Sequence, residues 1–430
     1  MRHRTMARLG LGCVALLTAV PAVAQETVRQ VSLSEALELA RRNNPTLDQS
    51  RSNLEIAQFN RLSSWGQFLP TVNLSYSFSD ASSGRLDPTG QRIVTTSYST
   101  QLRASYELFG GLRRFSSLKA SGLGVSAQEA RLREQDFTVS ERVKVAFFNA
   151  VANRDLVRVE QDRVARQEDQ LSFVRQQLEL GRATRSDILR SQVDLNNAKV
   201  ALLNAENSAR ASLFDLAEAV GVTGPVEPVE TAELETKPLE YDRAELLAMG
   251  LRGAPSLVSA QAQANADEAS VASARSAYLP TLLFSGGWAW QNSEFPPKNR
   301  SWSLSLSGNY PLFNGFTRES NLYRARATAD QSRAAERAAE LSLRTQLDAA
   351  ANTIESALAS VGLAEQTVEL SREDLRVTQE RYRLGLATIL DLQAAQITLR
   401  QAEVDLIRRR FDYQLGLARL EALLGTELRT

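Results

Sequence analysis

The stretch Gly-Arg-Ala-Thr-Arg-Ser-Asp at residues 181–187 recurs as Gly-Leu-Ala-Thr-Ile-Leu-Asp at residues 385–391, 204 positions further along the chain. Glycine readily takes the left-handed conformation that ends a helix, and a threonine three residues before an aspartate caps the helix that follows. The aspartate would lie near the positive end of that second helix. Each stretch therefore predicts a tight turn between two helices.

The segments around the two turns also repeat. The displacement of 204 relates Tyr106, Leu108, Phe109 and Gly111 to Tyr310, Leu312, Phe313 and Gly315. Nearer the start of each half the displacement is 210, as between Pro45 and Pro255, so the first half carries six extra residues. We expect a first structural repeat at 25–220, a crossover linker rich in proline and glutamate at 221–240, and a second repeat at 241–430.

Apolar residues recur every seven positions on both sides of each turn, in segments without proline. Before the turns they are Val143, Ala150, Val157, Val164, Leu171 and Leu178, then Leu347, Ile354, Val361, Val368, Leu375 and Tyr382. After the turns they are Ile188, Leu195, Leu202, Ala209 and Leu216, then Leu392, Leu399, Leu406, Tyr413 and Leu420. The period predicts left-handed coiled coils. A helix at 112–180 would be roughly 100 Å long, and shorter helices at 46–68 and 184–220 would together nearly match it.

Between the helices, at about 70–109 and 280–313, the pattern changes to strict alternation. Apolar residues such as Val72, Leu74 and Tyr76 alternate with small polar residues, mostly serine. Four strands of about ten residues would then have one apolar face and one polar face, as in a membrane barrel. The alternative is a soluble antiparallel sheet with one face on a core. Four strands are too few to close a barrel, so closure requires more than one chain.

Aromatic residues gather near the ends of the predicted strands: Tyr106, Phe109, Trp288, Trp290, Trp302, Tyr310 and Phe313. We interpret them as anchors at the membrane interfaces rather than as a ligand cage. The connections at 80–94 and 292–300 would face the cell exterior, because the longer loops of such barrels lie on that side.

Composition excludes most catalytic chemistry. Residues 1–24 have the basic, apolar and small-residue regions of a removable signal peptide, and they contain the only histidine, His3, and the only cysteine, Cys13. A mature chain would lack His or Cys ligands for zinc or haem, and it would lack Ser-His-Asp or Cys-His catalysis. We expect no catalytic residues, no cofactor and no metal. Basic and acidic residues number 50 each, so nucleic-acid binding is not expected.

The double repeat, the order of helix, hairpin, long helix and returning helix, and the two glycine-to-aspartate turns resemble the TolC family of outer-membrane efflux channels. The resemblance implies a mainly α fold with a small transmembrane β part. Long coiled-coil hairpins would form an α-barrel, and four strands per chain would contribute to a twelve-stranded β-barrel in a homotrimer. It further implies a passive duct from the periplasm across the outer membrane, working with a periplasmic adaptor and an inner-membrane pump in efflux or type I secretion.

The resemblance also assigns roles to the turns. The adaptor would dock at tips containing Gly181, Ala183, Thr184, Gly385, Ala387 and Thr388. Asp391, Asp187 and Tyr382 would form the constriction, with Tyr382 and Asp187 linking neighbouring helices at the closed end. Ala394 stands where better-known members have a second acid one turn after Asp391, so the network is thinner here.

Two other functions compete with the duct. A periplasmic coiled-coil adaptor would have one helical hairpin and a soluble β domain, whereas this chain predicts two hairpins and four alternating strands. A periplasmic hydrolase that uses carboxylates is disfavoured, because the sequence shows no pair of acids away from the coil surfaces and the helix tips.

Overall fold

The computed structural model describes residues 29–86, 93–229, 236, 238 and 241–428. The expected signal peptide at 1–24 lies outside these residues, as do parts of the first hairpin connection and of the linker at 221–240. No helix in the described ranges is both long enough and apolar enough to cross a membrane.

The two halves of the chain have the same order of elements. The first contains α1 (Leu33–Asn43), α2 (Pro45–Gly66), β2 (Thr71–Leu86), β3 (Ile93–Gly110), α3 (Arg113–Glu179) and α4 (Arg185–Val220). The second contains α5 (Arg243–Gly253), α6 (Pro255–Arg275), the 3-10 turn η2 (Ser276–Tyr278), β5 (Thr281–Asn292), β6 (Asn299–Asn309), α7 (Thr317–Arg383) and α8 (Ile389–Leu424). A small parallel pair, β1 (Arg29–Val31) with β4 (Val226–Pro228), lies outside this pattern.

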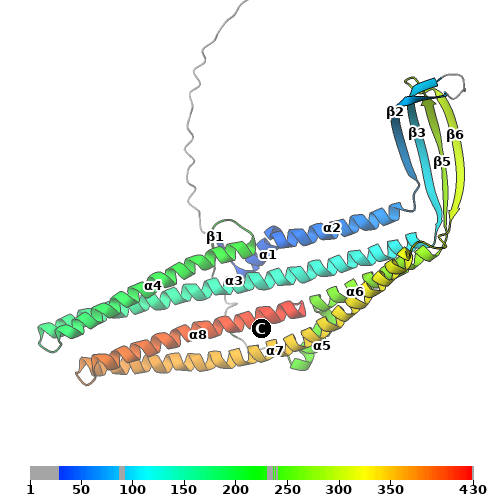
Figure 1. Ribbon diagram of the computed structural model, residues 1–430. Coiled ribbons are helices and arrows are strands. Elements are labelled where there is room, and N and C mark those ends of the chain that lie inside the picture. The colour runs from blue at the N-terminus through cyan, green and yellow to red at the C-terminus, as the bar shows by residue number, and fades with distance from the viewer. Residues whose placement is uncertain (1–28, 87–92, 230–235, 237, 239–240, 429–430) are drawn as a thin grey trace, which may run out of the picture.

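Two long helices determine the shape of the molecule. Figure 1 shows α3 and α7 running from the sheet at one end to the two turns at the other, with α2 and α4 in line beside α3. Helices α6 and α8 accompany α7 in the same way. The helices predicted at 46–68, 112–180 and 184–220 are confirmed to within three residues at each end.

The predicted seven-residue seams lie inside the coiled coils. Val143, Leu216 and Leu420 are 0% exposed, and most of the other seam residues are buried or half-buried. Leu178, next to the first turn, is exposed because its helix ends there. The apolar seams therefore hold α3 to α4 and α7 to α8, as the period predicts.

Helices α1 and α5 were not predicted. Each has 11 residues, which is about three turns and too short for a repeated heptad to be visible. Helix α1 packs against α3, α4 and the β1–β4 pair around Phe147, and α5 packs against α7 and α8 around Leu347. Helices α1 and α5 therefore occupy equivalent positions, about halfway along the two halves of the molecule.

The larger sheet is antiparallel in the order β2-β3-β5-β6. Its register places Leu74, Leu102, Trp288 and Trp302 directly opposite one another across the four strands. Since residues opposite each other point to the same face, the apolar residues share one face, as predicted. Within the described residues, the outer edges of β2 and β6 have no strand partner.

The first hairpin is longer than expected. Strands β2 and β3 have 16 and 18 residues, against the ten or so predicted, and residues 80–86 belong to β2 rather than to a loop. The ladder continues past an irregularity between Asp80 and Arg85. Backbone pairing therefore extends beyond the apolar alternation on which the prediction depended.

Both long helices begin with two consecutive left-handed residues. Gly111 and Leu112 have φ values of 62° and 63°, and Gly315 and Phe316 have 66° and 63°. Just beyond, the guanidinium of Arg114 lies 5.2 Å from the Phe68 ring centre and 5.3 Å from that of Tyr106. Arg318 repeats the arrangement, 4.3 Å from Tyr278. Stacked arginines thus stabilise each junction between strand and helix.

Candidate gate and docking tips

Both helical hairpins turn through the same backbone motif. Gly181 has a φ of 71°, its N–H donates to Leu178 O, and Arg182 N–H donates to Gln177 O. Gly385 has a φ of 75°, with corresponding bonds to Tyr382 O and Arg381 O. These are the two bonds of a Schellman motif, which satisfies the last carbonyls of a helix. The predicted glycine stops are confirmed at both turns.

A capping box then starts each returning helix. The Thr184 N–H and hydroxyl both donate to Asp187 Oδ2, at 2.8 and 2.7 Å, and Asp187 N–H donates back to the threonine hydroxyl at 3.3 Å. Thr388 and Asp391 make the same three bonds. Donation from the threonine N–H lowers the pKa of each aspartate, and both carboxylates are therefore charged at neutral pH.

The tips are open to solvent. Gly181, Thr184, Gly385, Thr388 and Asp391 are exposed, while Ala183, Ala387 and Asp187 are half-buried. The bonds that Asp391 accepts all end on Oδ2, so, in the part of the chain described, Oδ1 has no hydrogen-bond donor. A carboxylate oxygen at each tip thus remains available to ions or to another protein.

The Tyr382 side chain of the second hairpin packs against the first hairpin. The Tyr382 ring, in the last turn of α7, lies 5.8 Å from the Phe173 ring of α3. Burial raises the pKa of the Tyr382 phenol, and the charge of Asp187 raises it further. Asp391 belongs to the other turn, in which Thr388 is its bonded partner.

Sequence reasoning missed a row of polar contacts between the hairpins, farther from the tips. Gln393 of α8 donates to Asp194 of α4, and buried Gln167 of α3 donates to Gln396 of α8 at 2.8 Å. Higher up, the Arg400 guanidinium is 2.6 Å from Glu160. We call these three contacts the polar seam.

The sequence signal that could have revealed the polar seam is a second seven-residue repeat, made of polar residues. Glu160 and Gln167 are seven residues apart on α3, as are Gln393 and Arg400 on α8. Such polar stripes specify partner and register in coiled coils. The apolar seams therefore build each hairpin, and the polar seam joins the two hairpins together with the Tyr382–Phe173 contact.

The predicted interface aromatics form two groups at opposite ends of the sheet. Trp288 lies opposite Trp302 in the distal half, and Trp290 lies opposite Arg300. Tyr106, Phe109, Tyr310 and Phe313 lie at the helical end. They are exposed or half-buried; Tyr106, Trp288 and Trp302 line one groove on the sheet, and the other four lie outside it. Among the described residues, no group of three His, Cys, Asp or Glu side chains could hold a metal ion.

Comparison with known proteins gives one consistent result. The sequence pattern of the family described as outer membrane efflux protein matches residues 36–222 and 246–426. The chain is 24% identical over 395 residues to the outer membrane efflux protein BepC of Brucella suis, covering 88% of this chain and 84% of that protein. It is 24% identical over 420 residues to the outer membrane protein TolC of Vibrio cholerae, covering 92% and 91%. A solved membrane protein from Pseudomonas aeruginosa matches with a TM-score of 0.80 at 19% identity, covering 94% of this chain and 92% of the other.

Proposed function

The chain belongs to the outer membrane efflux protein family, and on that basis we propose that it is the trans-periplasmic duct of a tripartite efflux or type I secretion system. The observation that supports this proposal most directly is the continuity of the structure. A sheet with an apolar face leads directly into two long helical hairpins with exposed tips. The sheet lies in the outer membrane and the hairpins extend into the periplasm. An efflux duct moves its cargo by opening, and we propose that this chain catalyses no reaction.

The chain functions as a homotrimer in this proposal. The free edges of β2 and β6 need partners, and three chains supply twelve strands, enough for a closed barrel. Helix α2 also carries an exposed apolar stripe, whose members are Ile56, Phe59, Leu62 and Trp65. A spacing of three places these side chains along one side of the helix. Contact with α7 of the next chain would remove this stripe from water, next to the joined strands.

The tips form the gate and the docking surface. Three copies of Asp391 around the symmetry axis would form a ring of charge in the narrowest passage. The contact of Tyr382 with the first hairpin, together with the Gln393–Asp194 bond, would hold the second hairpin inward. The exposed turns around Gly181 and Gly385 would receive the adaptor, and their shared backbone motif would offer it two similar surfaces per chain.

The division into a signal peptide at 1–24, repeats at 25–220 and 241–430 and a linker at 221–240 is part of the same proposal. Its support is the common element order of the two halves. The adaptor alternative is not retained, because the matching family and the relatives reported above are outer-membrane proteins.

Native mass spectrometry and bilayer recording test the proposal together. Protein extracted from outer membranes in detergent should have the mass of three mature chains, and it should form discrete channels in planar bilayers. A monomer at all concentrations, or recovery in the soluble periplasmic fraction, would contradict the duct.

A further inference from the structure

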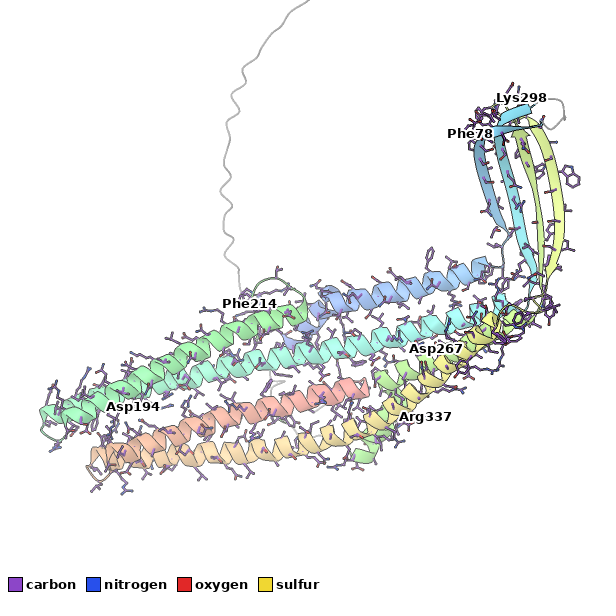
Figure 2. All side chains as sticks on the ribbon, viewed as in Figure 1. Phe78, Asp194, Phe214, Asp267, Lys298 and Arg337 are labelled. Carbon is purple, nitrogen blue, oxygen red and sulfur yellow. The ribbon has the colours of Figure 1, made fainter. Side chains whose placement is uncertain are left out.

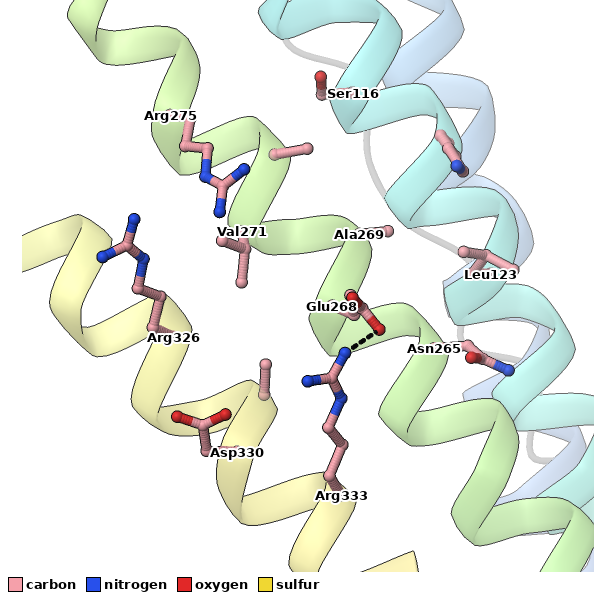
Figure 3. A pocket seen from close by; sticks show the side chains of 13 residues that line it. Ser116, Leu123, Asn265, Glu268, Ala269, Val271, Arg275, Arg326, Asp330 and Arg333 are labelled. Atoms are coloured by element: carbon pink, nitrogen blue, oxygen red, sulfur yellow. Dashed lines mark ion pairs between the residues drawn. The ribbon is translucent and has the colours of Figure 1, made fainter.

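A charged groove lies between α3, α6 and α7, close to the sheet. Its volume is about 700 Å³, and Figure 3 shows its walls, with Ser116 and Leu123 on α3 facing Arg275 and Arg326 from the other two helices. Four cationic side chains line it, Lys119, Arg275, Arg326 and Arg333, against two acids, Glu268 and Asp330. The groove is therefore positively charged overall.

Most of that charge is not neutralised within the chain. Arg333 pairs with Glu268 at 2.6 Å, shown by the dashed line in Figure 3. Over the described ranges, no ion pair or hydrogen bond engages the side chains of Lys119, Arg275 or Arg326. Three exposed cations thus line one groove without an ionic or hydrogen-bonding partner among the described residues of the chain.

The internal repeat provides a control for the role of these arginines. Displacements of 210 and 204 place Trp65, Gly122 and Glu129 at the positions equivalent to Arg275, Arg326 and Arg333. The first repeat forms the same α2–α3 packing with these other side chains. Packing of the helices therefore does not require the arginines, and a ligand of opposite charge is a better explanation for them.

The groove lies on the face of the helical layer that carries α5. Seven-residue steps along α7 lead from Arg326 and Arg333 to Leu347, and from Asp330 to Arg344. Both end points line a small pocket whose other wall is formed by α5. Three copies of α5 inside an α-barrel would obstruct the passage, so this face is the outer one. Arg275 is the last residue of α6, and β5 begins at Thr281. The upper end of the groove therefore lies next to the inner leaflet of the outer membrane.

We propose that this groove binds the phosphate of an anionic phospholipid headgroup from the inner leaflet. Arginine binds phosphate with two parallel hydrogen bonds, and basic pockets at a membrane surface attract anionic lipids. Arg275 and Arg326 would contact the phosphate, and Lys119 would add charge from the opposite wall. The proposal rests on the placement of the sheet in the outer membrane, and it adds an anchoring site that fixes the height and tilt of the duct.

Native mass spectrometry of the detergent-solubilised trimer tests the site, with phosphatidylglycerol as the probe. We expect saturation at one tightly bound lipid per chain and an affinity about 30-fold lower in Arg275→Gln/Arg326→Gln, at roughly fivefold per cation near a membrane surface. Arg275→Lys/Arg326→Lys should keep most of the affinity. The matched control is Arg61→Gln/Arg324→Gln, which removes two exposed arginines of α2 and α7 that do not line the groove.

Three results would overturn the proposal. The control variant could lose as much affinity as the groove variant, or phosphatidylethanolamine with the same acyl chains could bind as tightly as phosphatidylglycerol. Soluble glycerol phosphate could also bind as well as the lipid, which would make this a site for free anions. If the groove variant does not assemble, Lys119→Gln should still lower the affinity about fivefold, and an unchanged affinity would refute the site. Trimer mass and channel conductance, recorded on the same samples, test the duct separately.

Discussion

Tyr382 of α7 lies against Phe173 of α3, with ring centres 5.8 Å apart, so the last turn of the second hairpin rests on the first hairpin of the same chain. The charge of Asp187, at the start of α4, acts on the same phenol. Phe173 and Tyr382 are 209 positions apart in the sequence, and their contact joins the two elements that would have to separate for the tip to open.

Weakening this contact should raise the conductance of the resting channel. In Tyr382→Phe/Asp187→Asn the phenol hydroxyl and the charge of Asp187 are lost while the ring packing remains, so we expect the closed tip to leak. Planar-bilayer recording measures the effect. Asp391→Asn is the matched control, because it removes the equivalent capping carboxylate, whose hydrogen bonds go to Thr388 of its own turn and not to the first hairpin. Equal leakage in the control would show that helix capping, rather than the link between hairpins, closes the tip.

The Asp391 ring should make the resting channel weakly selective for cations. Asp391→Ala should lower that selectivity, measured as a reversal potential in a salt gradient, because each chain contributes one charge at this level and Ala394 contributes none. Exposed Asp374 on α7 offers a control, since Asp374→Ala removes one acid outside the tip turn. Unchanged selectivity in Asp391→Ala would exclude the ring.

The capping boxes also give the tips a pH dependence of known sign. The pKa values of Asp187 and Asp391 are lowered by the threonine N–H groups. The contribution of each box to stability is therefore fully present above the ordinary aspartate pKa, and it is lost as the pH falls through the lower folded value. Cation selectivity should be constant from pH 7 to about 5, where an unperturbed aspartate would still be ionised, and decline only in stronger acid. Bilayer recordings in a pH series measure it, and a midpoint near pH 6 would contradict the assignment.

The tip glycines should tolerate alanine better than the sheet glycine Gly287. At Gly181 and Gly385 a new Cβ would meet no atom within 4 Å, so the cost of alanine is only that of a positive φ, about 1 kcal/mol. At Gly287 a Cβ would lie 2.3 Å from Leu102 O, which pushes β5 away from β3. Thermal dissociation of the detergent trimer should therefore begin at a much lower temperature in Gly287→Ala than in Gly181→Ala.

The end of the sheet far from the helices should be accessible from outside the cell. Figure 2 labels Lys298 there, in the connection between β5 and β6. An epitope tag inserted after Lys298 should bind antibody on intact cells. The connection at 87–92, outside the described residues, should behave in the same way. Labelling only after the outer membrane is lysed would reverse the proposed orientation.

Regular periods made most of the fold predictable. Seven-residue seams such as Val143 to Leu171 located the coiled coils, and the alternation from Val72 to Phe78 predicted the faces of the sheet. Helices α1 and α5 escaped prediction because three turns contain too little periodicity. The cap residues of the tips, Gly181 and Thr184 among them, were predictable because a helix cap depends only on residues close together in the sequence.

The polar seam was not predictable. Gln167 and Gln396 are 229 residues apart in sequence, and their pairing depends on the axial offset between the two hairpins. Heptads reveal that polar stripes exist, and only the assembled structure shows which stripe faces which.

The difference between the apolar seams and the polar seam determines which contacts break first when force is applied to the tips. Separating α7 from α8 would expose a continuous row of leucines and valines to water. Separating the two hairpins would expose the Tyr382–Phe173 ring pair and a row of amides and charges, such as Gln167 and Arg400, that water solvates well. Under a pull at the tip, each coiled coil would therefore move as a stiff rod, and the joint between the rods would yield first. A duct built in this way can widen repeatedly without unfolding any of its helices.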